Sequence, residues 1–170
     1  LAQRGLKLNA RVLWITDSSK GLHKAWRDQY GKKLILQRCT IHKDRNIQCH
    51  LPKKYRPQAH RKFRLALEQN DYQDAEAMLR GINPSAADSL LEAFEELLTL
   101  HRLKVPALLR KTLHSTNLIE SVFSRVRSRE KNLKRYRNWG MSQRWLARVL
   151  LLAEKTFRTA KGYEQIHEVI

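Results

Sequence analysis

The sequence contains only two cysteines, Cys39 and Cys49, among its 170 residues. So few thiols exclude a disulfide-stapled scaffold, and the absence of any secretory signal pattern points to a reducing compartment. No apolar run approaches the ~18 to 20 residues that a membrane-spanning helix needs. We therefore expect a cytoplasmic protein that has no membrane partner.

Several common catalytic motifs are also missing. The sequence has no glycine-rich phosphate loop, no Gly-x-Ser-x-Gly elbow and no dinucleotide-binding fingerprint, so nucleotide hydrolysis and serine-hydrolase chemistry have no support. Its first residue is Leu1 rather than Met, and the opening ten residues read like the end of a helix followed by a turn. We therefore expect the chain to be part of a longer protein.

Acidic residues are scarce, since 34 Lys and Arg face 16 Asp and Glu, for a net charge of +18. Residues 1–67 carry +14, residues 68–100 carry −7 and residues 101–170 carry +11. Clustered cations gain free energy by releasing counterions from a polyphosphate, so nucleic acid is the favoured partner. The alternative is a solvated basic surface that has no partner.

The first forty residues have the pattern of two strands joined by a helix. Residues 11–17 form a short, partly β-branched apolar run, and residues 33–37 form a second one. Between them, residues 21–30 have helical spacing and are followed by Gly31, a good helix stop. Short connections of this kind predict a βαβ unit with parallel strands.

The rest of the chain reads as helices. Residues 85–103 predict one long helix with Ser85 as its N-cap, and the acidic helices of this region look like packed amphipathic helices. Two further helices are expected over 117–135 and 142–159, with a loop between them. The first of these has an apolar face made by Leu118, Ile119, Val122, Phe123, Val126 and Leu133.

Glu120 lies on the polar side of the first of these helices. At helical spacing it shares a face with Ser124, Arg127 and Lys131, an arrangement that suits a metal ligand beside a phosphate-binding track. The alternative is structural, because Asn117 and Glu120 have the spacing of a capping box, in which the glutamate only satisfies a backbone N–H.

Asp17 and the pair Cys39 and His42 follow the two predicted strands. Asp17 stands at the end of the first strand, where a turn residue is the structural alternative. Cys39 and His42 are one helical turn apart and could supply half of a zinc site, with Cys49 and His50 as a poorly spaced second pair. A buried thiol with a locally bonded histidine is the simpler interpretation.

Three blocks, WITDSSKGLHKAW, LQRCTIHKDRNIQCHLPKKY and STNLIESVFSRVR, occur in the same order as in the bacterial mutator-type insertion-sequence transposases, which this sequence resembles. These enzymes have an RNase H-like catalytic domain of the Asp-Asp-Glu kind. The resemblance implies Mg²⁺-dependent cleavage and strand transfer at transposon ends. It matches Asp17 to the second catalytic aspartate, Glu120 to the catalytic glutamate, and Cys39 and His42 to the Cys-x-x-His element near the site.

The resemblance also implies which part of the enzyme is present. The family's first catalytic aspartate lies on an upstream strand, yet none of the 16 residues before Asp17 is acidic. Asp17 and Glu120 alone supply too few ligands for two Mg²⁺ ions. We therefore expect a carboxy-terminal transposase fragment that is inactive or nearly inactive alone, with an unpaired edge on the Asp17 strand.

The expected fold is α/β but predominantly helical: an incomplete RNase H-like core that retains two parallel strands and carries a large all-helical insertion. We expect residues 1–50 to form the partial core with the Asp17 strand, 51–105 the helical insertion, and 106–170 the glutamate helix and the carboxy-terminal helices that complete the core. In the intact enzyme Asp17 and Glu120 would hold Mg²⁺, and His42 would lie near the scissile phosphate.

The expected partners are double-stranded DNA, as transposon ends and as target, and further copies of the chain in a homo-oligomer, placed in the bacterial cytoplasm near the nucleoid. The residues expected to contact the DNA backbone are Arg125, Arg127, Arg129, Lys131, Lys134 and Arg135. A solvated helix face is the alternative for them. The competing functions are a noncatalytic helical nucleic-acid-binding protein and a structural zinc module built around Cys39 and His42.

Overall fold

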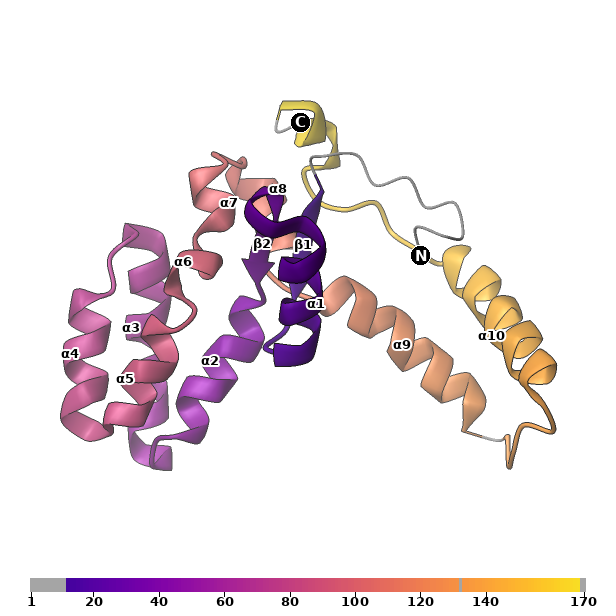
Figure 1. Ribbon diagram of the computed structural model, residues 1–170, viewed down its shortest axis with the longest axis horizontal. Helices are drawn as coiled ribbons and strands as arrows, with labels where there is room; N and C mark the ends of the chain where they lie inside the picture. The colour runs from indigo at the N-terminus through magenta and orange to yellow at the C-terminus, as the bar shows by residue number, and fades with distance from the viewer. Residues whose placement is uncertain (1–11, 132, 169–170) are drawn as a thin grey trace.

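A computed structural model describes residues 12–131 and 133–168 of the protein (Figure 1). The turn expected over residues 1–10 and the first residue of the expected strand, Arg11, lie outside the described residues. In the described part, no helix is both long enough and apolar enough to cross a membrane.

Two short parallel strands form the sheet, as the sequence predicts. β1 (Leu13–Thr16) pairs with β2 (Ile35–Arg38) in a register that sets Leu13 against Ile35 and Thr16 against Arg38. Among the described residues β1 pairs with β2 alone. Both strands end at the same edge of the sheet, and the residues that follow them therefore become neighbours.

Helix α1 (Lys20–Tyr30) connects the strands and packs on the sheet through aromatic rings. The ring of Trp14 in β1 stacks on Trp26 of α1 with 3.7 Å between ring centroids, and Tyr30 lies 5.7 Å from the same Trp14 ring. The helix ends at Gly31, whose φ of 51° lies in the left-handed region that glycine adopts without a steric penalty. The expected helix stop is therefore confirmed, and a turn of 3-10 helix, η2 (Gly31–Lys33), leads into β2.

A helical bundle follows the sheet and contains most of the core. Its elements are α2 (Thr40–Cys49), η3 (Lys53–Tyr55), α3 (Arg56–Gln69), α4 (Gln73–Ile82), α5 (Pro84–Leu91) and α6 (Phe94–Leu97). The bundle buries apolar side chains from Ile47 to Leu98 in one continuous cluster. A smaller cluster of Leu100, Val105 and Leu109 packs against Leu13 of the sheet.

The single helix expected over 85–103 is wrong, because the chain breaks there into α5, α6 and α7 (Thr99–Arg102). The N-cap is Asn83 rather than Ser85, and the Asn83 side chain accepts a bond from the Ser85 backbone N–H. The fully buried amide of Gln37 explains the break between α6 and α7. It donates to the Leu97 carbonyl (2.9 Å) and accepts from the Leu100 N–H (3.0 Å), so it satisfies backbone groups that a helix break leaves free.

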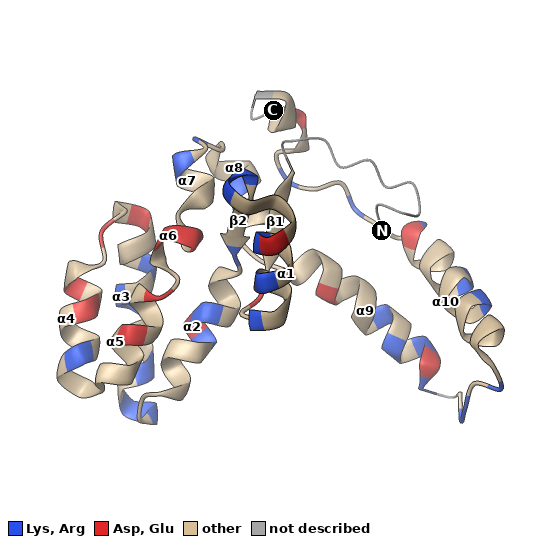
Figure 2. Cartoon of the chain, viewed as in Figure 1, with Lys and Arg blue, Asp and Glu red and all other residues tan. Residues whose placement is uncertain are grey.

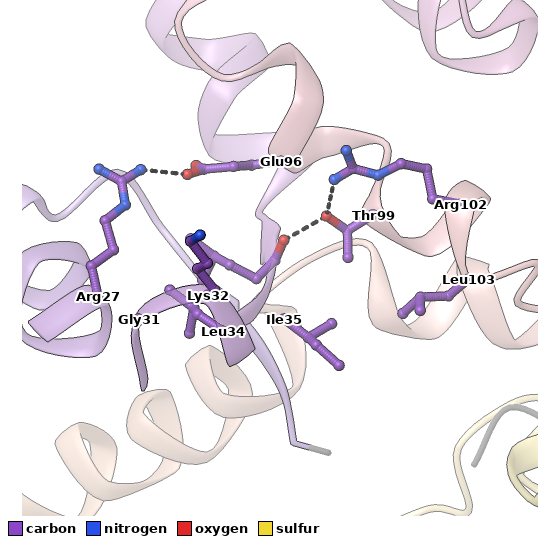
Figure 3. Close-up of a pocket in the computed structure, with 10 residues that line it drawn as sticks. Arg27, Gly31, Lys32, Leu34, Ile35, Glu96, Thr99, Arg102 and Leu103 are labelled. Carbon is purple, nitrogen blue, oxygen red and sulfur yellow. Dashed lines mark hydrogen bonds and ion pairs between the residues drawn. The ribbon is translucent and has the colours of Figure 1, made fainter. Parts of the chain in front are cut away.

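Polar side chains of α6 and α7 also form contacts with β2 and α1. The Thr99 hydroxyl donates to the Leu36 carbonyl over 2.6 Å, and Glu96 lies close to the Arg27 guanidinium (Figure 3). The first bond holds α7 against β2, and the second holds α6 against α1. The parallel pairing of β1 and β2, among elements that are otherwise helical, confirms the prediction of parallel strands within a mostly helical chain. The RNase H-like core and the insertion over 51–105 stay predictions, because a two-stranded parallel pair is common to many α/β folds.

The last third extends away from the sheet. After α8 (Ala107–Leu113), helices α9 (Asn117–Glu130) and α10 (Trp139–Glu154) form an arm on the side opposite the bundle, followed by η4 (Tyr163–Glu168) (Figure 1). Both helices differ from the expected bounds: α9 ends at Glu130, and α10 begins inside the expected loop. Of the apolar face expected on α9, only Val126 is buried, whereas Leu118 is 56% exposed and Phe123 is 52% exposed.

Candidate active site

Asp17 lies directly after β1, on the exposed surface at the carboxyl edge of the sheet. Its Oδ1 accepts a hydrogen bond from the Ser19 backbone N–H (3.0 Å), which is the turn contact that the structural alternative describes. One oxygen of the carboxylate thus orders the loop, and the carboxylate stays open to solvent. The position fits a metal ligand, since side chains at the carboxyl ends of parallel strands converge on ligands.

His23 supports this loop from beneath, a role that the sequence did not reveal. It is a buried residue of α1, and its Nε2–H donates to the Asp17 carbonyl (2.8 Å), with the Thr16 hydroxyl at the same distance. On its other side, Nδ1 lies 3.9 Å from Glu96 Oε2. A lone histidine in an amphipathic helix has no pattern that marks it, so only the tertiary contact identifies this role.

Cys39 and His42, which follow β2 at the carboxyl edge of the sheet, lie close to the start of α9. Cys39 is fully buried, and its Sγ lies 3.2 Å from His42 Nδ1. The backbone N–H of Thr116 donates to Cys39 Sγ over 3.4 Å, and the Thr116 hydroxyl oxygen lies at the same distance from this sulfur. The Cys39 backbone N–H also donates to the Thr16 carbonyl (2.7 Å), so Cys39 as a whole joins β1, α2 and the start of α9.

Glu120 belongs to this cluster. Its Oε1 lies 3.8 Å from His42 Nδ1 and accepts a hydrogen bond from the Thr116 hydroxyl. The side chain of Glu120 is 41% exposed and that of His42 is 31% exposed, so both can meet a ligand from solvent. The structure therefore brings Cys39, His42 and Glu120 together, with Thr116 as a central residue that the sequence reasoning missed.

The capping box of Asn117 and Glu120, the structural alternative for Glu120, does not form. The N-cap of α9 is Thr116, and Asn117 is the first helical residue. Glu120 then stands one position beyond the place that a capping-box glutamate occupies, and its carboxylate bonds to a side-chain hydroxyl rather than to a backbone N–H. Threonine is a common N-cap residue, but the Thr116 hydroxyl makes no capping bond, so this preference does not predict its contacts with Cys39 and Glu120.

Buried ion pairs hold α2 and β2 in place behind the site. Lys43, next to His42, has a side chain only 2% exposed, and its Nζ lies 2.7 Å from Glu92 Oε2. Arg38, 4% exposed, bonds to Glu92 (3.3 Å) and Glu96 (2.7 Å). Burial raises the pKa of the Glu92 carboxyl, but the bond and charge of Lys43 and the charge of Arg38 outweigh it, so the pKa lies below its ordinary value.

The cations expected to contact DNA lie along and beyond α9. Arg125, Arg127 and Arg129 are exposed on the helix, and Lys131 is its C-cap. Lys134 and Arg135, which the sequence placed within this helix, lie after it and are also exposed. Figure 2 shows basic residues on the half of α9 farther from the sheet, whereas Glu120 lies near its start. One helix thus leads from the Glu120 cluster to a positively charged segment.

A preformed metal cage is absent from the described residues, which contain no group of three or more His, Cys, Asp or Glu side chains placed to hold an ion. Cys39 and Cys49 stand at opposite ends of α2, whose ten residues span about 15 Å. They are too far apart to share one zinc ion. The two exposed carboxylates, Asp17 and Glu120, are hard oxygen donors of the kind that Mg²⁺ accepts while keeping most of its waters.

Comparison with known proteins gives one family match. A family model described as "Transposase, Mutator family" matches residues 1–160. No curated protein and no solved structure matches the chain. The matched range includes the sheet, the helical bundle and both helices of the arm.

Proposed function

The chain belongs to the Mutator family of transposases, and we propose that it contributes the second aspartate and the glutamate of an Asp-Asp-Glu site for DNA strand cleavage and transfer. The observation that carries this proposal is the cluster at the carboxyl edge of the sheet. There Glu120 meets His42 and Cys39. Asp17 follows the strand that pairs with the one before Cys39.

Each residue has a distinct role in this proposal. Asp17 and Glu120 would hold Mg²⁺, and His42, partly exposed and 3.8 Å from Glu120, would face the scissile phosphate. Cys39 is fully buried and therefore positions the cluster rather than touching DNA. When bound, Mg²⁺ supplies the charge that activates an attacking hydroxyl and stabilises a leaving oxygen.

The donor set fits an ion that binds together with its substrate. Mg²⁺ is commonly held by one or two carboxylates plus phosphate oxygens, and it dehydrates reluctantly. Two carboxylates are too few to fix the pair of ions that strand transfer uses. We therefore expect little or no DNA cleavage from the ligands of this chain alone, and tight ion binding only in the presence of DNA.

DNA would lie along α9, with its backbone on the exposed cations. Arg125, Arg127 and Arg129 project from the helix, and Lys131, Lys134 and Arg135 continue the positive charge beyond it. Such contacts bind phosphates without reading sequence. The helix begins at the Glu120 cluster, so the same element orients the phosphate backbone and supplies a metal ligand.

Iron-mediated backbone cleavage tests the metal site in this chain. Fe²⁺ replaces Mg²⁺ and, with ascorbate and peroxide, produces radicals that cut the polypeptide close to the ion. With duplex DNA bound, we expect cuts near Asp17 and near Glu120, suppressed by excess Mg²⁺. Asp17→Asn and Glu120→Gln should each remove both cuts, whereas Glu130→Gln, on the same helix, should not. Cuts that persist in both site variants would refute the assignment.

A noncatalytic DNA-binding role is the second candidate, and one observation favours it. Asp17 accepts from the Ser19 N–H and Glu120 accepts from the Thr116 hydroxyl, so each acid already has a structural bond. In that case duplex DNA binds to α9, but Fe²⁺ cuts nowhere near these carboxylates. The cleavage pattern therefore separates the two functions.

A further inference from the structure

A cavity adjoins the candidate active site. It lies between α2 and α3 on one side and α7 and α8 on the other, and its volume is about 540 Å³. This is within the range of small-molecule sites, roughly 300 to 1,000 Å³. We call it the α3–α8 cleft, and its apolar wall consists of Ile41, Phe63, Leu67, Leu97 and Leu100.

Three side chains that line the α3–α8 cleft have buried polar atoms without a hydrogen-bond partner in the described part of the chain. They are Asp44 Oδ1, His101 Nδ1 and His114 Nδ1. The other oxygen of Asp44 bonds to His60 Nδ1 over 2.7 Å, so this carboxylate is held in place with its second oxygen unused. Buried polar atoms nearly always have partners, so three exceptions among the residues that line one cleft favour a polar group beside them, from a water or from a ligand.

Positive charge is available at the cleft. Arg110 and Lys111 of α8 line it, and neither forms an ion pair with a carboxylate in the residues that the structure describes. Burial, and after it the charge of Arg110, lower the pKa of His101. His101 is therefore neutral at pH 7, so one ring nitrogen can donate and the other can accept.

A cavity of about 680 Å³ beside β2, lined by Arg27, Lys32, Glu96, Thr99 and Arg102 among others, differs in this respect. Figure 3 shows most of its polar side chains already joined, Arg27 to Glu96, and Thr99 both to Arg102 and to a backbone carbonyl, with the exposed Lys32 as the exception. Arg102 also pairs with Glu95 over 2.9 Å. Its polar groups do not require a ligand, whereas those of the α3–α8 cleft lack partners.

The α3–α8 cleft and the candidate active site share a wall. The backbone N–H and the hydroxyl of Thr40 both donate to the His114 carbonyl, over 3.0 and 3.2 Å. Thr40 follows Cys39, and His114 precedes Thr116 by two residues. A ligand in the cleft therefore lies beside the place where the scissile phosphate would bind.

We propose that the α3–α8 cleft binds a single nucleotide, with the base against the apolar wall and the phosphate at Arg110 and Lys111. Asp44 Oδ1 would accept from an exocyclic amino group of the base, as carboxylates do with cytosine. The two histidines complete the contacts to the base edge. The same residues form no metal site, since no suitable group of ligands occurs in the described residues.

The nucleotide in the α3–α8 cleft could come from either of two sources that have the same chemistry. One is a nucleotide of bound DNA that is turned out of the double helix, and the other is a free mononucleotide. The first source rests on the proposed function, because it requires DNA at the candidate active site. Turning a base out of the stack costs least when that base is already unpaired. An unpaired nucleotide in a duplex is therefore the sharpest probe.

The test compares three probes by fluorescence anisotropy and competition: a duplex with one unpaired adenine, the same duplex fully paired, and free dAMP. We expect the unpaired duplex to bind about tenfold more tightly than the paired one, the order of a single base contact. Asp44→Ala removes the acceptor that the exocyclic amino group of adenine needs, and Arg110→Ala removes the phosphate contact. Both should abolish the preference, while Arg61→Ala, an exposed cation of α3 outside the cleft, should keep it.

Ala107→Phe provides an independent check, because Ala107 lines the cleft yet is exposed, so a ring there blocks the cavity without entering the core. Loss of the preference in this variant supports the proposal. A preference that survives all three cleft variants overturns it, as does equal affinity for both duplexes without dAMP binding. Binding of dAMP without binding of paired duplex supports the cleft and refutes the proposed function.

Discussion

The buried ion pairs behind the candidate site make a strong prediction about stability. Lys43 is 2% exposed, and its ammonium group depends on Glu92, which lies 2.7 Å away. Replacing Glu92 by Gln keeps the shape of the side chain but leaves Lys43 as a buried cation without a counter-charge. Because Lys43 neighbours His42 in α2, this change should loosen the helix that carries part of the site.

The expected magnitude follows from the burial of the two partners. Removing one partner of a fully buried pair costs about 3–5 kcal/mol. The Glu92 side chain is 56% exposed, so water partly replaces it, and we expect a loss of about 2–3 kcal/mol in the free energy of unfolding. In a chain of this length that corresponds to a fall in Tm of roughly 5–10 °C.

Urea unfolding followed by tryptophan fluorescence measures this loss. Lys43→Met should rescue Glu92→Gln to within about 1 kcal/mol of the parent, because it removes the stranded charge and keeps the volume. Glu95→Gln is the matched control, since its carboxylate is 76% exposed in its pair with Arg102 and should cost under about 1 kcal/mol. A loss as small as the control, or no rescue, would refute the reasoning.

The pH dependence of the same variant has a defined sign. The folded-state pKa of Glu92 lies below its ordinary value of 4.5, so its contribution to stability is present above pH 4.5 and disappears as the pH falls through the folded pKa. The difference between the parent and Glu92→Gln should therefore shrink on acidification. A difference that stays constant down to pH 3 would argue against an ionic origin.

Two further predictions concern the cations of α9 and the close contact of Gly162 with α8. Arg127→Ala and Arg129→Ala should each reduce the slope of log affinity against log salt for duplex DNA by about one, and an unchanged slope in both would remove α9 from the DNA interface. Gly162→Ala should lower the free energy of unfolding by about 1–3 kcal/mol, because φ is 75° and the new Cβ would lie 2.7 Å from the Leu109 backbone nitrogen. Gly21→Ala, with nothing within 4 Å, should instead be neutral or stabilising, and equal losses in both glycine variants would contradict this explanation.

Local sequence patterns were sufficient to predict the two strands and the helix at the start of the described chain. Two apolar, partly β-branched runs around a helix that stops at Gly31 predict parallel strands, and β1 and β2 confirm them. The same kind of pattern failed over residues 85–103, where an unbroken amphipathic run is divided into three helices. Gln37, a buried residue on a distant strand, bonds to the break, and no local propensity contains that information.

The candidate site shows the same division. Asp17, Cys39, His42 and Glu120 stood out through their position after strands or on a polar helix face, and the structure places the last three together. Thr116 did not stand out, although it joins Cys39 to Glu120, because its contact spans 77 positions of sequence. Such contacts depend on packing between elements rather than on the spacing of residues within one element.

The sequence by itself determined the distribution of charge along the chain, the parallel strand pair and the residue types available for catalysis, since these follow from local chemistry. Only the tertiary structure decided that Thr116 links the thiol to the glutamate, that Lys43 and Arg38 are buried cations, and that unpaired polar atoms gather in one cleft beside the site. The physical reason is that burial and hydrogen bonding depend on which distant segments meet, and a side chain acquires its electrostatic role only from those neighbours.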